Sequence, residues 1–218
     1  MTKAEIIKRL LDPGVIAIIR ADSSDGLMEA AQALADGGIT AMEVTMTTPD
    51  AIRVIGDVTA QLGDNILMGV GSVLDPETAR VAILAGAEFV VTPVTRPEVI
   101  RMCNRYGKPI ASGAFTATEA LLSHESGADF IKIFPADQAG PAYIKNLLAP
   151  LPMLQIVPTG GVTPENAADF LAAGCVALGA GSTLVSREIL QNKDWQRLRE
   201  RAEAFVKAVR LARAKKPG

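Results

Sequence analysis

The chain alternates eight times between two kinds of segment, and this alternation restricts its fold more than any other feature. Short apolar runs rich in β-branched residues are each followed by a longer Ala- and Leu-rich run with helical periodicity, and Gly, Pro, Thr or Asp stands at the joins. We expect strands at 15–20, 41–46, 66–71, 88–93, 109–114, 129–134, 154–159 and 175–180. We expect helices near 24–36, 49–62, 76–86, 96–106, 117–127, 141–149, 164–173 and 192–214.

Local signals at the ends of the expected helices agree with this division. The sequences TPDA, DPET, RPEV and TPEN place Pro in a first helical turn. The sequences ADGG, LAGA, ESGA and AAGC place Gly at a helix end, where a left-handed residue stops the helix. The N-terminal MTKAEIIKRLLDPG is predicted to be a short amphipathic helix that ends at Pro13-Gly14.

Eight strand–helix units predict an α/β fold, a (β/α)8 TIM barrel with a short N-terminal helix. We expect residues 1–218 to form a single barrel domain. Continuous apolar strands are typical of a parallel sheet that is covered on both faces. A doubly wound open sheet is the alternative, but no Gly-rich dinucleotide fingerprint follows the first expected strand.

Composition disfavours several classes of function. The net charge is −2 and basic residues are spread along the chain, except in the C-terminal VRLARAKKPG, which we interpret as a solvated helix end and a frayed tail; no nucleic-acid partner is expected. One His and two Cys are too few for the usual protein-built zinc or iron sites, so no such metal site is expected. We expect no other cofactor. No apolar run reaches the ~20 residues that span a bilayer, and the N-terminus does not look like a signal peptide. We therefore expect no membrane partner and a cytoplasmic setting.

Polar side chains near the ends of the expected strands are the candidates for a functional site, because barrel enzymes carry their active sites at the C-terminal ends of the strands. Glu43 and Lys132 stand out, since both lie mid-strand between apolar residues. If Glu43, Thr45 and Thr47 share the lumen with Phe130, Lys132 and Phe134, one carboxylate and one amine share a cavity of low dielectric constant. The candidates of this kind are Arg20, Glu43, Thr45, Thr47, Ser72, Thr92, Lys132, Thr159 and Ser182.

Residue types alone leave two interpretations of Glu43 and Lys132 open: a buried ion pair, or a catalytic pair. A free lysine has a pKa of about 10.4, and lowering it to ~7–8 for nucleophilic work takes roughly 4 kcal/mol of differential environment. An apolar strand can supply this by desolvation, whereas a close carboxylate opposes it. The pair would work best as a catalyst with a water or the substrate between the two groups. A neutral amine can then form an imine with a ketone, and the carboxylate can move protons.

Two Gly-rich stretches end the last two expected strands and predict a phosphate site. They are PTGGVTPEN (158–166), with Gly160 and Gly161, and GAGSTLV (179–185), with Ser182. Backbone amides without side chains at a helix N-terminus bind anions, and phosphate sites after strands 7 and 8 recur in such barrels. Ser72, in GVGSVLDPETA (69–79), either donates to a substrate oxygen or satisfies its turn.

Six segments carry a resemblance to a known family. EVTMTTP, GVGSVLDPETA, FVVTP, FIKIFPA, PTGGVTPEN and GAGSTLV occur in this order between about Val15 and Val185. Together they resemble the bacterial class I aldolases of the 2-keto-3-deoxy-6-phosphogluconate (KDPG) aldolase family, which includes 6-phosphogalactonate (KDPGal) and 4-hydroxy-2-oxoglutarate (KHG) aldolases. The resemblance implies a (β/α)8 barrel, usually a homotrimer, that reversibly cleaves a phosphorylated keto acid to pyruvate and glyceraldehyde 3-phosphate without a metal.

The resemblance also assigns roles to residues. It implies Lys132 as the Schiff-base lysine and Glu43 as the general acid/base. It implies Pro93 and Phe134 as walls of the pyruvate pocket and Ser72 near the pyruvate carboxylate. It implies that Gly160, Gly161 and Ser182 hold the phosphate.

One position departs from the pattern of the family. Thr47 stands where several members carry an arginine that contacts substrate, and a hydroxyl does not replace a bidentate arginine contact. We hypothesise that Arg20, at the end of the first expected strand, supplies the missing charge. The departure leaves the C4 stereochemistry and the length of the substrate open.

Two other classes of function remain as alternatives at this stage. One is a phosphosugar isomerase, epimerase or synthase on a similar barrel, which would share the phosphate loops without needing a mid-strand lysine. The other is a catalytically silent barrel that serves in binding or assembly. A borohydride-reduced pyruvate adduct on Lys132 is expected for the aldolase alone.

Overall fold

The computed structural model describes residues 1–214 and confirms the predicted barrel. Eight parallel strands follow one another in the order β7-β6-β5-β4-β3-β2-β1-β8, and a bridge between Thr159 and Gly179 joins the two ends of the sheet into a nearly closed barrel. The strands are β1 Val15–Ile19, β2 Ala41–Thr45, β3 Leu67–Gly71, β4 Phe89–Val91, β5 Ile110–Ala114, β6 Phe130–Ile133, β7 Ile156–Pro158 and β8 Leu178–Ala180. The last four residues of the predicted 1–218 domain, and with them the end of the predicted frayed tail, lie outside the described residues.

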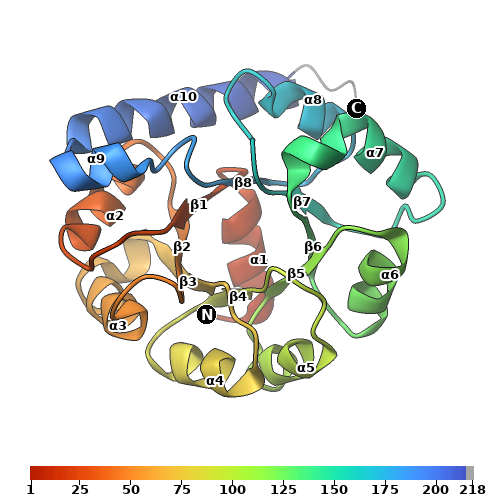
Figure 1. Ribbon diagram of the computed structural model, residues 1–218, viewed down its shortest axis with the longest axis horizontal. Helices are drawn as coiled ribbons and strands as arrows, with labels where there is room; N and C mark the ends of the chain where they lie inside the picture. The colour runs from red at the N-terminus through yellow and green to blue at the C-terminus, as the bar shows by residue number, and fades with distance from the viewer. Residues whose placement is uncertain (215–218) are drawn as a thin grey trace.

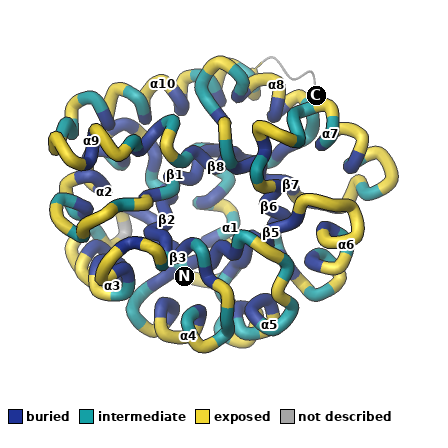
Figure 2. Tube along the Cα trace, in the orientation of Figure 1, coloured by how far each residue is buried: buried dark blue, intermediate teal, exposed yellow. Residues whose placement is uncertain are grey.

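Helices form a ring around the strands (Figure 1). Their inner faces are buried against the barrel and their outer faces are exposed (Figure 2), so one layer of the apolar core lies between strands and helices. The helices are α1 Lys3–Leu11, α2 Leu27–Asp36, α3 Ala51–Leu62, α4 Pro76–Leu84, α5 Pro97–Arg105, α6 Ala117–Glu125, α7 Ala136–Leu148, α8 Ala167–Ala172, α9 Arg187–Asn192 and α10 Trp195–Ala214, with a short 3-10 turn, η1, at Gly63–Asn65.

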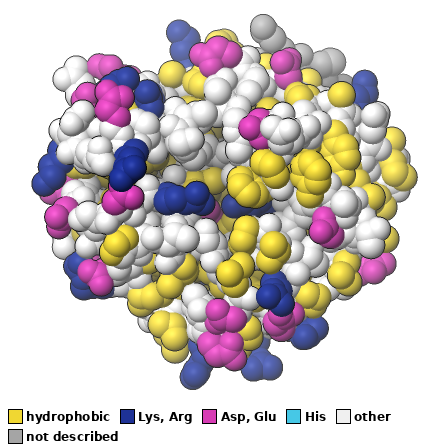
Figure 3. Space-filling model, viewed as in Figure 1, with side chains coloured by type: hydrophobic (Ala, Val, Ile, Leu, Met, Phe, Trp, Pro, Cys, Tyr) yellow, Lys and Arg dark blue, Asp and Glu magenta, His cyan; other side chains and the backbone are white. Residues whose placement is uncertain are grey.

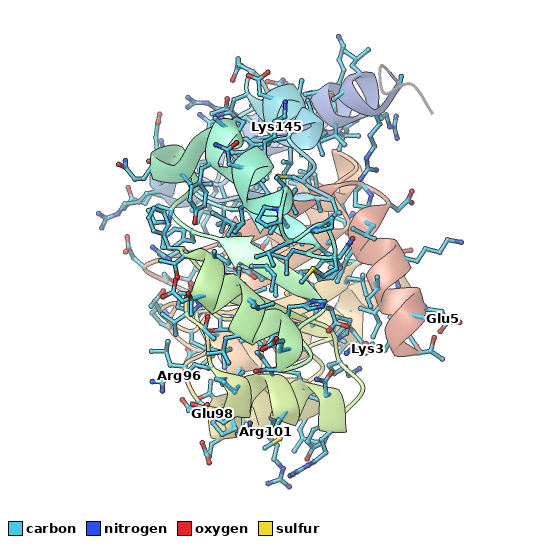
Figure 4. The ribbon with its side chains drawn as sticks, turned by 90° about the vertical axis from the view of Figure 1, so that its right-hand side faces the viewer. Lys3, Glu5, Arg96, Glu98, Arg101 and Lys145 are labelled. Atoms are coloured by element: carbon cyan, nitrogen blue, oxygen red, sulfur yellow. The ribbon has the colours of Figure 1, made fainter. Side chains whose placement is uncertain are left out.

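The predicted N-terminal helix, α1, closes one end of the barrel. It begins with a capping box in which Thr2 and Glu5 satisfy each other's backbone amides. Its buried Ile6 and Leu10 belong to a second apolar cluster with lumen residues of the strands, such as Phe89 and Phe130. In the side view, Lys3 and Glu5 mark this helix at the edge of the barrel (Figure 4). Because α1 fills the N-terminal end, the lumen is open only toward the C-terminal ends of the strands within the described chain.

Two predicted helices differ from the structure. The seventh starts at Ala136 rather than near 141, and it contains a kink at Gly140, which has a φ of 71°. The apolar pattern before Pro141 is too short to indicate a separate turn. The last helix, predicted over 192–214, is α10 and begins at Trp195, and the short α9 before it was not predicted. Lys193 adopts a left-handed conformation at the end of α9 and separates the two helices. The turn between them places Lys193 toward the site described below.

The register of the strands puts Glu43 and Lys132 at opposite sides of the lumen. Glu43 on β2 pairs with Ile18 on β1 and Gly69 on β3. Lys132 on β6 pairs with Gly113 on β5 and Val157 on β7. Glycines therefore flank both charged side chains, and the lumen between these side chains keeps free space.

Candidate active site

A cavity of about 520 Å³ opens at the C-terminal ends of the strands, where the barrel fold is expected to carry its site. Basic side chains gather near the centre of this face, beside a patch of hydrophobic ones (Figure 3). Of the ten predicted site residues that the sequence analysis placed at the catalyst or the substrate, nine line the cavity: Arg20, Glu43, Ser72, Pro93, Lys132, Phe134, Gly160, Gly161 and Ser182. The structure thus brings together side chains that are up to 162 positions apart in the sequence, from Arg20 to Ser182.

Glu43 and Lys132 meet at the bottom of this cavity without a hydrogen bond between them. Lys132 Nζ lies 4.0 Å from Glu43 Oε1, which exceeds hydrogen-bond length. Glu43 is 1% exposed and Lys132 8%, so water screens neither charge well. Glu43 Oε1 has no hydrogen-bond partner among the described residues. A buried oxygen without a hydrogen bond destabilises the fold unless a water or a ligand donates one to it. The gap between the two groups is therefore suited to a bound molecule.

Burial shifts the pKa values of both groups toward their neutral forms. Desolvation lowers the pKa of Lys132, the nearby Glu43 carboxylate opposes that shift, and Arg20 adds to it. Desolvation raises the pKa of Glu43, and Lys132 and Arg20 both oppose it. The direction for Lys132 is the one that nucleophilic work requires, because only the unprotonated amine attacks a carbonyl carbon.

The sign of these shifts gives a first prediction, on pH dependence. Below the pKa of Lys132 the amine is protonated, so the rate of imine formation with pyruvate should fall as the pH decreases through that value. Because the Glu43 carboxylate raises the pKa of Lys132, Glu43→Gln should move this acid limb to lower pH. The measurement is the rate of cyanoborohydride-trapped adduct formation against pH for both proteins. An acid limb that does not move, or that moves to higher pH, contradicts the assigned coupling.

Apolar and cationic groups surround the amine. Lys132 Nζ lies 5.5 Å from the centroid of the Phe134 ring. This distance allows a cation–π interaction when the amine is protonated. Pro93 lines the cavity from the end of β4, and Ser72 does so directly after β3, with an unusual left-handed φ of 59°. A non-Gly residue in this conformation is a strained position of the kind that clusters at functional sites. Arg20 reaches the cavity from the end of β1.

Two candidates from the sequence, Thr47 and Thr92, are not among the residues lining the cavity. Thr92 is buried, and its hydroxyl donates a 2.7 Å hydrogen bond to the carbonyl of Val94. Thr47 is the residue of the two to which the sequence analysis gave a place at the substrate.

Thr47 is exposed, and its Oγ1 lies 2.9 Å from Oγ1 of Thr45, which does line the cavity. Thr45 in turn approaches Thr48, whose Oγ1 accepts a hydrogen bond from the Ala21 amide. Thr47 therefore contacts a residue of the cavity wall and not the cavity itself, whereas Arg20 lines the cavity close enough for its charge to act on Glu43 and Lys132.

The two predicted phosphate loops lie side by side after β7 and β8. Gly160 and Gly161 both have positive φ, of 94° and 69°, and a side chain at either would be strained. Thr183 donates a 2.6 Å hydrogen bond to the carbonyl of Val162, which ties the second loop to the first. No atom of residues 1–214 lies within 4 Å of where a Cβ on Gly181 would stand, so the backbone there is open to a ligand.

Sequence reasoning missed one side of the cavity. The segment after β1 and the short α9 supply further lining side chains, and Arg187 Nε pairs with Asp22 Oδ2 at 2.6 Å between these two segments. No local motif marks these residues, because only the approach of the first and last units of the barrel brings them together. The additional polar residues on this side are Asp22, Ser23, Asp25, Arg187, Gln191 and Lys193.

The described part of the chain offers neither a cluster of metal ligands nor a membrane-spanning helix. Residues 1–214 contain no group of three or more His, Cys, Asp or Glu side chains placed to hold a metal ion. None of the described helices is both long enough and apolar enough to cross a bilayer.

A barrel whose buried amine faces a carboxylate across a cavity, beside two Gly-rich anion loops, defines a Schiff-base type of enzyme site. The sequence model of the family described as "Aldolase: KDPG and KHG aldolase" matches residues 6–201. The chain belongs to this family of aldolases, which are carbon–carbon lyases.

Individual relatives agree with this assignment. The 2-dehydro-3-deoxy-6-phosphogalactonate aldolase of Escherichia coli K12 is 39% identical over 199 residues, covering 91% of this chain and 95% of that protein. The 2-dehydro-3-deoxy-phosphogluconate aldolase of Pseudomonas aeruginosa is 34% identical over 197 residues, covering 88% of this chain and 89% of that protein.

Solved structures show the same fold. A KDPG aldolase from Legionella pneumophila, with pyruvate captured as a covalent carbinolamine intermediate, superimposes with a TM-score of 0.82 at 28% identity over 89% of this chain and 98% of that chain. A cage designed by fusing symmetric oligomeric domains contains a chain that superimposes with a TM-score of 0.86 at 38% identity, over 92% of this chain and 73% of that one.

Proposed function

We propose that the chain is a class I aldolase that reversibly cleaves 2-keto-3-deoxy-6-phosphogluconate to pyruvate and D-glyceraldehyde 3-phosphate through a Schiff base, without a metal. The observation that carries this proposal is the 4.0 Å gap between the buried Lys132 amine and the Glu43 carboxylate in a cavity that also reaches both Gly-rich loops. A phosphosugar isomerase on the same barrel would not need such an amine, and a silent barrel would not need to keep it buried.

The reaction follows from the two groups. The neutral Lys132 amine attacks the C2 ketone to give a carbinolamine. The carbinolamine hydroxyl takes a proton from solvent and leaves as water, which leaves a protonated imine; the final hydrolysis returns this proton. Glu43 takes the proton of the C4 hydroxyl, the C3–C4 bond breaks, the aldehyde leaves, and the bonding electrons pass into the imine to form an enamine. Glu43 returns the proton to C3, and water hydrolyses the imine to release pyruvate and the free amine.

The ends of the substrate would occupy different walls of the cavity. Arg20 and Ser72 would hold the carboxylate next to the ketone, and Pro93 and Phe134 would pack against the pyruvate part. Gly160, Gly161 and Ser182 would hold the phosphate with backbone amides and a hydroxyl. Thr47 would orient the hydroxyl of Thr45 through the 2.9 Å hydrogen bond between their Oγ1 atoms, and it would not touch the substrate.

Ser182→Ala tests the phosphate assignment and gives a second prediction. Loss of a hydrogen bond to a charged group should raise the KM for the phosphorylated substrate about 10- to 100-fold. The KM for pyruvate in the condensation direction should stay unchanged, because the pyruvate part contacts other residues. Steady-state kinetics in both directions measure the two values. An equal rise in both, or a rise in neither, contradicts the placement of the phosphate at this loop.

A second candidate substrate is the C4 epimer, 2-keto-3-deoxy-6-phosphogalactonate. It is favoured by the 39% identity to the phosphogalactonate aldolase. The discriminating experiment compares the kcat/KM for cleavage of the two epimers and of 4-hydroxy-2-oxoglutarate with one enzyme preparation. We expect the phosphogluconate epimer to be cleaved fastest. Faster cleavage of its epimer assigns the chain to the phosphogalactonate activity, and failure to cleave any of the three rejects the proposal.

We further propose that the chain works as a cytoplasmic homotrimer. Exposed apolar residues follow four consecutive strands next to the cavity: Leu74, Val94, Phe115 and Phe134. The Phe115 ring also stacks on Tyr143, with centroids 6.1 Å apart. An apolar patch of this kind on a metabolic enzyme favours an interface between copies. Multi-angle light scattering should give the mass of a trimer.

A further inference from the structure

Gly71 ends β3 directly beneath the carboxylate of Glu43. It pairs with Thr45 across the β2–β3 ladder, and its carbonyl accepts a 2.9 Å hydrogen bond from the Met46 amide. A Cβ built on Gly71 would stand 2.6 Å from Glu43 Oε1 and 2.8 Å from Glu43 Cδ. Both distances are far shorter than van der Waals contact, so the carboxylate occupies the space of the side chain that Gly71 lacks.

The backbone conformation at position 71 does not require a glycine. Gly71 is not among the glycines with a positive φ, so an alanine could adopt its conformation without strain. The three closest atoms that a methyl group would meet all belong to the Glu43 carboxylate, which is the mobile end of a flexible side chain.

Other lumen glycines differ from Gly71 in the atoms that an added side chain would meet. A Cβ on Gly113 would collide with the main chain of Pro93 and Val94, and a Cβ on Gly69 would run into the Phe89 ring. At those two positions glycine is needed for the packing of the barrel itself. At Gly71 the group that must give way is the Glu43 carboxylate.

We propose that Gly71 is a positioning residue for catalysis: the absence of a side chain there sets where the Glu43 carboxylate lies, and thereby the gap between this carboxylate and the Lys132 amine. The inference rests on the proposed function, because it concerns the acid/base that this function uses. A methyl group at position 71 must push the carboxylate away by several tenths of an ångström to about 1 Å. A displacement of that size in a catalytic group costs up to about 100-fold in rate.

Gly71→Ala should therefore fold and lower kcat about 10- to 100-fold, while the KM for the keto acid changes much less. Borohydride reduction with pyruvate should still give an adduct on Lys132, because the amine itself is untouched. The matched control is Gly56→Ala, inside α3 and away from the site, where the nearest atom to a new Cβ is the carbonyl of Ala85 at 3.5 Å. It should keep wild-type kinetics.

Rescue by a shorter acid separates positioning from a general structural effect. Glu43→Asp alone should lose activity, since its carboxylate is one methylene short. In the double variant, Gly71→Ala with Glu43→Asp, the shorter side chain leaves room for the methyl group. The double variant should therefore be more active than the product of the two single losses predicts.

The outcomes are distinct from those that test the proposed function. If the wild-type chain cleaves none of the keto acids, the proposed function fails. If the wild type is active and Gly71→Ala has a kcat within twofold of it, the inference is overturned. Losses that simply multiply in the double variant also overturn it. So does failure of Gly71→Ala to fold, because the inference requires that the methyl group meets nothing but the carboxylate.

Discussion

Lys132→Met should abolish cleavage, with a loss in kcat/KM of at least about 10⁴-fold. Methionine is similar in length to lysine and suits a buried strand, so β6 should pack as before and the variant should fold. The loss follows because, of the two described lysines that line the cavity, Lys132 is the one that is buried and faces Glu43. Steady-state cleavage assays on the purified variant, with far-ultraviolet circular dichroism as a check on folding, measure the effect.

Lys132→Arg is the matched control for this variant. It keeps a cation opposite Glu43 but cannot lose its proton, so it should be as inactive as Lys132→Met. If Lys132→Arg kept more than about a tenth of wild-type activity, the positive charge and not the nucleophilic amine would be what the reaction uses. That outcome would remove the Schiff base from the mechanism.

Glu43→Gln should lower kcat about 10²- to 10⁴-fold, the range of a general acid/base. The amide has nearly the shape of the carboxylate but cannot carry protons, so binding and imine formation should persist. Exchange of the pyruvate methyl protons with deuterium oxide, followed by nuclear magnetic resonance, isolates the proton-transfer step. We expect the variant to lose this exchange while it still forms the reducible adduct on Lys132.

Two outcomes would contradict the role of Glu43. Normal methyl exchange in Glu43→Gln would mean that a different base moves the proton. Loss of the adduct together with the exchange would mean that the carboxylate is needed to assemble the site and not to carry out the proton transfer.

The fold was predictable because each unit of the barrel carries its own local signals. The prolines that open α4 and α5, Pro76 and Pro97, and the glycines that end α2 and α8, are readable without tertiary contacts. The inward direction of Glu43 and Lys132 was also predictable, since alternate residues of a strand face the same side and the apolar neighbours of both residues indicate burial. Nine of the ten predicted site residues consequently lie around one cavity.

The parts that sequence reasoning missed depend on backbone conformations that the residue types leave open, or on contacts between distant segments. The kink in α7 at Gly140 and the left-handed Lys193 that ends α9 are of the first kind. The pairing of Asp22 with Arg187 requires the first and last units to be neighbours in the ring. The reason for glycine at position 71 appears only when the Glu43 carboxylate is seen above it.

Thr47 is the position at which the chain departs from the family pattern. Its sequence position suggested contact with substrate, whereas its hydroxyl lies 2.9 Å from that of Thr45, which lines the cavity. Arg20 remains the proposed anchor of the substrate carboxylate, because it reaches the cavity and its charge acts on the pKa values of both Lys132 and Glu43.

The central claim, that burial leaves the amine at position 132 unprotonated often enough to capture a keto acid, has one direct test. The native protein is incubated with pyruvate and sodium borohydride near neutral pH, digested, and mapped by tandem mass spectrometry. The account predicts one reduced pyruvate adduct, on the β6 peptide, with the modification on its lysine. An unmodified β6 peptide alongside active enzyme, or an adduct on a surface lysine alone, would contradict it.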